Sequence, residues 1–437
     1  MQAASIARTD RRGWASIDLT YTLFIVFLVA ALWLFLDPLY TGYGEYRVTR
    51  ALGPLQYAAL TLALGTSVLA IVGLHLVGRR LPRTAAAALR MGWPILVLGA
   101  YVLCGAAYAR WYLGVQDTFL SVAVGTFAFP VAVVLYFSTR FPHRLVASFF
   151  WGLLIASPYA IGWIVLKRIE GGQAFHNEIF LIVPLAVYFF QRMQATWIRW
   201  SVVSCMIVTG LATDKLTGYV TLLITCAFLV GPPAKRRFQS ARIAERLAIL
   251  YVALIAAMLL IGGVVFLIAR RQQYLPGGSA EVRSQTYLTA WDRFVASPIY
   301  GDGFTTASWQ WLTGLHVLGE PHIGTHSDML DLLSHGGIIA IVLYGFGISR
   351  VVIAAGTLKR LSAEASAEIR GLTPIVICGV FATAFNSPFL SVQISTLFWF
   401  AFGLLAAIAA SARYGWGTTI LPAPHVAPRR WAKIGGI

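Results

Sequence analysis

The sequence carries little charge for its length, and most of that charge is positive. Only 12% of the 437 residues are Asp, Glu, Lys or Arg, with 17 acidic residues against 34 basic ones. Hydrophobic residues make up 58% of the chain. Soluble domains carry about 25% charged residues, so this composition excludes an ordinary soluble protein. Several apolar runs near the length of a bilayer-spanning helix indicate a polytopic membrane protein.

Cysteine and the usual motifs of soluble enzymes are also scarce. The four cysteines (Cys104, Cys205, Cys226 and Cys378) fall inside apolar runs without metal-ligand spacing, which excludes a disulfide framework and a zinc site. The chain has no Walker loop, no dinucleotide-binding glycine motif after a strand, no HExxH and no Asp-x-Asp pair. We therefore expect no metal and no cofactor, and any chemistry has to come from scattered polar residues.

The apolar runs predict an all-α bundle of about twelve transmembrane helices in a single integral-membrane domain, 1–437. The charged stretch before the first run lacks a cleavage site, so we expect that run to remain as a span. Two of the twelve runs are short and could be broken or tilted. The predicted spans are 19–36, 52–78, 91–109, 119–138, 145–166, 179–191, 198–212, 217–231, 247–269, 330–349, 372–386 and 391–411.

The basic residues alternate between the two sides of these spans. With the N-terminus inside, 24 of the 34 basic residues lie in one set of connections and 10 in the other. By the positive-inside rule both termini are then cytoplasmic, including the tail 412–437. The positive excess is thus explained by topology, and we expect no nucleic-acid partner.

One connection, 270–329, is much longer than the others and falls on the outer side. Apolar residues recur at helical spacing within it, at Tyr287, Ala290, Trp291 and Phe294, and Ser297 before Pro298 marks the helix end. Arg283 lies four residues before Tyr287 and continues the same stripe. A loop of this length in a compact bundle is usually functional.

Four polar positions stand out on the predicted outer side: Asn177, Lys215, Arg283 and His326. Each also has a simpler interpretation. Asn177 can cap a helix, Lys215 can extend to the membrane interface, Arg283 can contact lipid headgroups, and His326 can be an ordinary loop histidine.

The stretch THSDMLDLLSHGG, residues 325–337, opens the span that follows the long connection. Ser327 is a plausible N-cap, and Asp328 and Asp331 suit the first turns of a helix. His335 lies further along and is expected to pack or hydrogen-bond inside the bundle. A metal pair of His326 with His322 is disfavoured because Pro321 and Gly324 interrupt the helix that would align them.

These pieces together resemble the O-antigen ligase and polymerase family of bacterial membrane glycosyltransferases. The resemblance covers about residues 170–350. It rests on Asn177 before Pro184-Leu185, Lys215 in a short outer turn, Arg283, Trp291 and Ser297-Pro298…Gly301-x-Gly303 in the long loop, and HSDMLDLLSHGGIIA opening the next span.

The resemblance implies transfer of a glycan from a polyprenyl diphosphate carrier to an acceptor hydroxyl, at the periplasmic face of the bacterial inner membrane and without a metal. His326 is then the base, since histidine titrates near neutral pH. Lys215 and Arg283 hold the diphosphate, and Asn177, Asp328 and Trp291 bind or orient substrate. The expected partners are the lipid-linked donor, the glycan acceptor, membrane lipid and other polysaccharide assembly proteins.

Lys215 departs from the Ser-Arg pair that is usual in ligases of this family, because Asp214-Lys215 stands there. Lysine neutralises phosphate but lacks the planar fork of arginine. This favours a polymerase of exopolysaccharide or O-antigen repeats, with a ligase to lipid A core as the alternative. A polysaccharide transporter or flippase is the second alternative, since twelve spans with both ends inside is also a transporter layout.

Overall fold

The computed structural model describes residues 82–115, 119–139, 141–170, 178–213, 216–240, 279–306, 327–358, 361–385 and 392–414, with Phe389 and part of a helix over 21–29. Helices are the only regular elements in these ranges, and no strand occurs among them. The predicted all-α class is therefore confirmed for this part of the chain.

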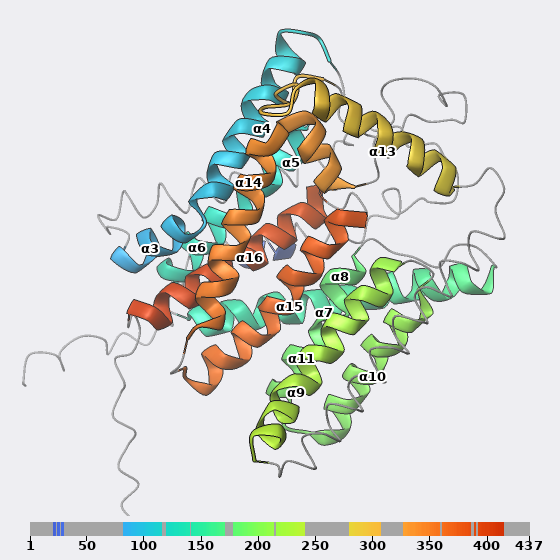
Figure 1. Ribbon diagram of the computed structural model, residues 1–437. Coiled ribbons are helices and arrows are strands. Elements are labelled where there is room, and N and C mark those ends of the chain that lie inside the picture. The colour runs from blue at the N-terminus through green and yellow to red at the C-terminus, as the bar shows by residue number, and fades with distance from the viewer. Residues whose placement is uncertain are drawn as a thin grey trace, which may run out of the picture.

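The helices pack against one another as a bundle (Figure 1). They are α3 (Arg83–Met91), α4 (Trp93–Trp111), α5 (Leu120–Thr126), α6 (Ala128–Ser138), α7 (Pro142–Ile169), α8 (Ile179–Ile182), α9 (Leu185–Arg192), α10 (Thr196–Ala212), α11 (Leu216–Ser240), α13 (Ser279–Ala296), α14 (Asp328–Gly356), α15 (Ala363–Phe385) and α16 (Val392–Tyr414).

Within the described ranges, five helices are long and apolar enough to cross a membrane: α4, α14, and most of α7, α15 and α16. Four shorter apolar helical stretches accompany them, over Val122–Ser138, Ile179–Arg192, Thr196–Ala212 and Thr217–Val230. The chain is thus a membrane protein. The predicted spans 52–78 and 247–269, most of 19–36 and the tail after 414 lie outside the described residues.

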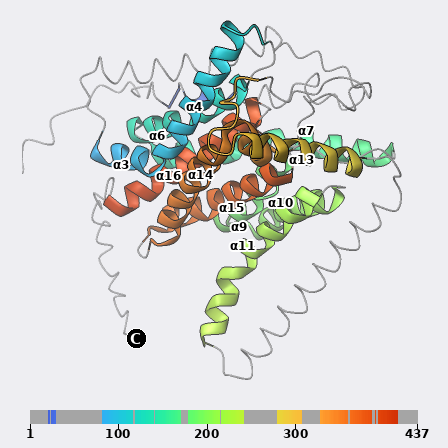
Figure 2. The same ribbon diagram turned by 45° about the horizontal axis from the view of Figure 1, so that its top comes forward.

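The core forms around α16, in which every residue from Ile394 to Ala410 is buried. Small residues such as Ala406, Ala407 and Ala410 allow close approach of α5 and α6 on one side and α14 and α15 on another. Trp399 is 1% exposed and its ring contacts those of Tyr344 and Phe389. Figure 2 shows α16 enclosed by these neighbours.

Two of the apolar runs are interrupted helices. The run 179–191 forms α8 and α9, separated by Val183 and Pro184, as its short length predicted. Proline lacks the N–H that would continue the hydrogen-bond ladder, which explains the break. The run 119–138 also divides, into α5 and α6 at Phe127. That break was not predicted.

Helix α13 confirms the helix expected in the long connection. It ends at Ala296, and the N–H of Ser297 bonds the carbonyl of Arg293 at 3.1 Å. Of its apolar stripe, Ala290 is buried, whereas Trp291 is 53% exposed. Figures 1 and 2 both show α13 lying across the end of the bundle at which α14 begins.

Candidate functional site

The start of α14 is fixed at Ser327, as the sequence predicted. The Ser327 hydroxyl accepts the N–H of Leu330 at 3.3 Å, and this N-cap is fully buried. The same oxygen lies 2.9 Å from the carbonyl of Ala384 at the end of α15. Ser327, which directly follows His326, is therefore held against α15.

Both acidic residues of the first turn of α14 are buried. Asp328 is 4% and Asp331 is 3% exposed. The carboxylate of Asp328 accepts the N–H of Phe389 at 2.9 Å. Asp328, expected to bind or orient substrate, thus links the start of α14 to the chain between α15 and α16.

Helix α14 is broken ten residues after its cap. Gly337 has φ 61° and ψ −163°, a conformation that side-chain-bearing residues rarely adopt. The N–H groups of Ile338 and Ile339 therefore lack acceptors in the preceding turn of their own helix. Instead they bond the carbonyls of Pro298 and Ile299, at 2.9 and 3.3 Å.

The segment 297–306, which we call the docked turn, supplies those carbonyls. It also donates to α14, since the N–H of Phe304 bonds the carbonyl of His335 at 3.2 Å. The approach is so close that a Cβ on Gly301 would lie 2.4 Å from the carbonyl carbon of His335. The long connection is thus joined to α14 by main-chain hydrogen bonds on both sides of the break.

A buried histidine and a carboxylate meet where the docked turn contacts α14. His335 is 1% exposed, and its Nδ1 lies 2.7 Å from Oδ2 of Asp302, whose side chain is 25% exposed. Thr306 donates its hydroxyl to the same Oδ2 at 2.5 Å. Nδ1–H of His335 donates to this carboxylate.

The hydrogen bonds around Asp302 control its ionisation. Partial burial alone would raise the pKa of this carboxyl group. The hydrogen bond and charge of His335, with the bonds from Thr306 and the N–H of Phe304, outweigh burial and hold the pKa below its ordinary value. Asp302 is therefore kept as an acceptor-only carboxylate.

Aromatic rings enclose the Asp302–His335 pair. The Phe304 ring makes edge contacts with Tyr101 of α4 and with Phe119, at centroid distances of 5.3 and 5.2 Å, and Phe119 lies 4.7 Å from the His335 ring. Phe304 adopts φ 62°, unusual for a residue with a side chain. Burial of its ring and the bond from its N–H to Oδ1 of Asp302 stabilise that conformation.

The structure describes only some of the residues expected to act in catalysis. Asn177, Lys215 and His326 lie outside the described residues. Arg283 belongs to α13 and lies two turns before Ala290. The N-cap of α8 is Glu178, which directly follows Asn177. The roles of these residues, and of Trp291, remain predictions.

Residues that are close to Asn177 and Lys215 in the sequence, and that the structure describes, pack near one another. Ile179, two residues after Asn177, forms a buried cluster with Ile164 and Val183. Ala212, three residues before Lys215, packs against that cluster, as does Leu222 of α11. The beginning of α8 and the connection between α10 and α11 therefore lie at the same end of the bundle.

The start of α14 lies at that same end. Cys378 of α15 has its Sγ 3.8 Å from the carbonyl of Thr221 in α11, close after Lys215 in sequence. Six residues further along α15, Ala384 binds the Ser327 cap. The chain segments next to Asn177, Lys215 and His326 thus adjoin one end of the bundle.

Asp302 is the polar residue that the sequence did not single out. It lies in the stretch IYGDGF, which directly follows the predicted helix end at Ser297-Pro298. An Asp before a Gly commonly hydrogen-bonds the N–H two residues on, as Asp302 does with Phe304. That signal predicts a turn but not its contact with His335.

Among the residues that the structure describes, no three His, Cys, Asp or Glu side chains cluster as metal ligands would. No protein-family model matches the chain, and no curated protein sequence matches it.

Proposed function

We propose that this chain is a membrane glycosyltransferase that polymerises polyprenyl-diphosphate-linked oligosaccharide repeats, as exopolysaccharide and O-antigen polymerases do. Its motifs resemble those of the O-antigen ligase and polymerase family. The observation that carries the proposal is that the segments adjoining Asn177, Lys215 and His326 gather at one end of the bundle.

The reaction needs a base and a cationic site for the leaving group. The acceptor hydroxyl attacks the anomeric carbon, the bond from that carbon to the diphosphate oxygen breaks, and His326 accepts the hydroxyl proton. The diphosphate leaves with its electron pair, and Lys215 and Arg283 stabilise its charge. Asn177 and Trp291 orient the glycan, while Asp328 supports the start of α14 through Phe389.

The same proposal includes a topology. About twelve spans place both termini in the cytoplasm and 270–329 outside, in the inner membrane of a bacterium. A single cysteine at Ser308, in a background lacking the four natural cysteines, should react with a membrane-impermeant maleimide on whole cells. Labelling only after lysis would reverse the topology and remove the outer site.

A defined lipid-linked repeat unit tests the activity. Purified full-length protein in detergent, where no second compartment exists, should convert it to longer lipid-linked chains detectable by mass spectrometry. A transporter gives no product under these conditions. Adding lipid A core as acceptor distinguishes the ligase, which would form a core-linked glycan without lengthening the repeat.

A further inference from the structure

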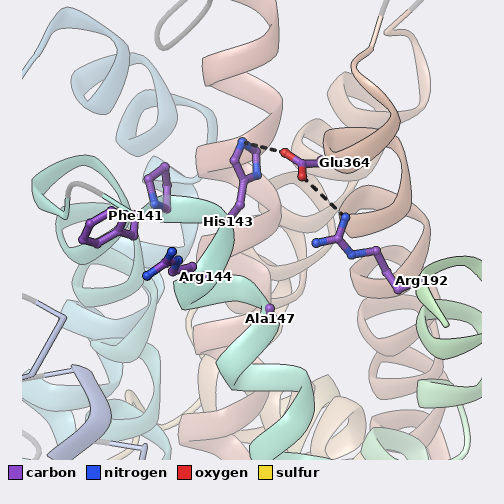
Figure 3. Close-up of a pocket in the computed structure, with 7 residues that line it drawn as sticks. Phe141, His143, Arg144, Ala147, Arg192 and Glu364 are labelled. Atoms are coloured by element: carbon purple, nitrogen blue, oxygen red, sulfur yellow. Dashed lines mark ion pairs between the residues drawn. The ribbon is translucent and has the colours of Figure 1, made fainter. Parts of the chain in front are cut away.

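A second polar site lies away from the α14 break, in a cavity of about 320 Å³. It opens between the first turn of α7, the end of α9 and the start of α15, as Figure 3 shows. Helix α15 begins seven residues after α14 ends at Gly356, so about 30 Å of helix separates this region from His335. Its lining is Phe141, Pro142, His143, Arg144, Ala147, Arg192 and Glu364.

The acidic groups at this cavity already face basic partners. Nδ1 of His143 lies 2.9 Å from Oε1 of Glu368, whose side chain is fully buried behind the cavity. Nε2 of His143 lies 3.8 Å from Glu364, and Arg192 lies 3.7 Å from the other oxygen of Glu364 (Figure 3). The negative charge of Glu364 is therefore offset within the lining.

Arg144 is the basic residue of the lining whose charge is not offset by an acidic residue of the described chain. Its guanidinium carbon lies 4.7 Å from the centre of the Phe141 ring, and it forms no ion pair with any residue that the structure describes. Stacking on a ring leaves the edge N–H groups of a guanidinium available as donors. Among the lining side chains, Arg144 and Arg192 exceed Glu364 by one positive charge, while the buried Glu368 behind the cavity faces His143.

Exposed aromatic residues place the cavity near a membrane interface. Trp197 and Trp200 in the first turns of α10 are 74% and 50% exposed, and they follow Arg192 closely in sequence. Phe141 at the cavity is 41% exposed. Tryptophans concentrate at the level of lipid headgroups, and the sequence assigns Arg144 and Arg192 to the cytoplasmic side.

We propose that this cavity binds a phosphate group, supplied by the headgroup of an anionic phospholipid. Arg144 donates to the phosphate from the Phe141 side, and Arg192 faces it from α9. The first-turn N–H groups of α7 add the positive end of the helix dipole. The site is independent of the glycosyl-transfer site and requires only that the protein lie in a membrane.

Lipid titration followed by native mass spectrometry tests this site with the full-length protein. Phosphatidylglycerol should bind more tightly than phosphatidylcholine, because only the former has a net negative headgroup. Arg144→Gln should weaken phosphatidylglycerol binding about tenfold, the usual effect of losing one charge-assisted contact. Arg192→Gln should weaken it further, because it also removes the arginine that offsets the charge of Glu364.

Arg413→Gln is the matched control, since Arg413 is exposed on the side predicted to be cytoplasmic and does not line the cavity. It should leave lipid binding unchanged. Arg144→Lys should restore part of the binding if charge is what the site recognises. Each variant is checked by its melting temperature without added lipid, which Arg144→Gln should not lower because Arg144 is exposed.

Inorganic phosphate identifies the source of the bound group. If millimolar inorganic phosphate does not compete with phosphatidylglycerol, the bound group is a lipid headgroup. If it does compete, and Arg144→Gln abolishes that competition, the cavity is a phosphate site whose ligand is soluble phosphate. Equal binding of both lipids, or unchanged binding in folded Arg144→Gln and Arg192→Gln, would overturn the proposal. None of these results depends on glycosyl transfer.

Discussion

Nδ1 of His335 lies 2.7 Å from Oδ2 of Asp302, joining the docked turn to α14 across 33 residues of sequence. Asp302→Asn keeps the shape of the side chain and removes its charge. We expect it to lower the free energy of unfolding by about 1–3 kcal/mol, the effect of a hydrogen bond to a charged group. Unfolding of purified protein in mixed micelles of increasing SDS content measures this loss.

Asp292→Asn on exposed α13 is the matched control, with the same chemical change outside the contact. It should alter stability by less than about 0.5 kcal/mol. Equal effects of the two substitutions would show that the His335 contact contributes nothing specific.

The same carboxylate makes stability depend on pH in acid. Its pKa is lower in the folded protein than its ordinary value of 3.8. The contribution of Asp302 is therefore complete above that ordinary value and is lost as pH falls through the lowered folded pKa. The stability difference between the natural protein and Asp302→Asn should be constant from about pH 5 to 7 and shrink below about pH 4. A difference that grew in acid would contradict this sign.

Gly337→Ala tests the break in α14. The backbone there has φ 61°, and an added Cβ would lie 2.4 Å from the carbonyl of Ile299. We expect a loss of more than about 2 kcal/mol, because the docked turn has to move away. Gly345→Ala, in the same helix with open space around it, should instead gain up to about 1 kcal/mol. Thermal unfolding of both variants in one detergent compares them.

Lys215→Ala and Arg283→Ala test the proposed diphosphate site. Each should lower turnover of a lipid-linked donor by about 10²–10³-fold, the loss seen when one charge-stabilising donor is removed. Lys215→Arg should retain activity if charge rather than side-chain shape is required. Full activity of either alanine variant at both limiting and saturating donor would remove that residue from the site.

His326→Ala should abolish glycan transfer while donor binding persists. Activity of the natural protein should fall as pH drops through about 6.5, the unperturbed histidine value, because a protonated imidazole cannot accept the hydroxyl proton. His322→Ala, four residues earlier, is the control and should remain active. Transfer by His326→Ala with an unchanged pH profile would assign the base elsewhere.

Local chemistry made part of this structure predictable. Capping specified the start of α14 at Ser327, Pro298 indicated the end of α13, and Pro184 explains the division of a short apolar run. Each depends on residues within one or two turns. The sequence also indicated that His335 would lie inside the bundle, as it does.

Long-range contacts were not predictable in the same way. The span expected over 330–349 continues to Gly356, since an apolar period cannot show how far a helix extends past its membrane segment. Nothing local indicates that Asp302 meets His335, because the contact depends on where α13 crosses the bundle. The division at Phe127 differs, because it has a local signal that the prediction did not use: Pro130 lacks the N–H that would bond the carbonyl of Thr126.

The docked turn also bears on how the long connection can evolve. Phe304 is bonded to His335, and Ser327 is bonded to Ala384. The 22 residues between Phe304 and Ser327 therefore form a loop whose two ends are held by the bundle. Doubling the length of such a loop costs only about 0.6 kcal/mol in closure entropy. Closure entropy therefore places little constraint on the length of this connection, whereas Thr306 near its beginning is held by its hydrogen bond to Asp302.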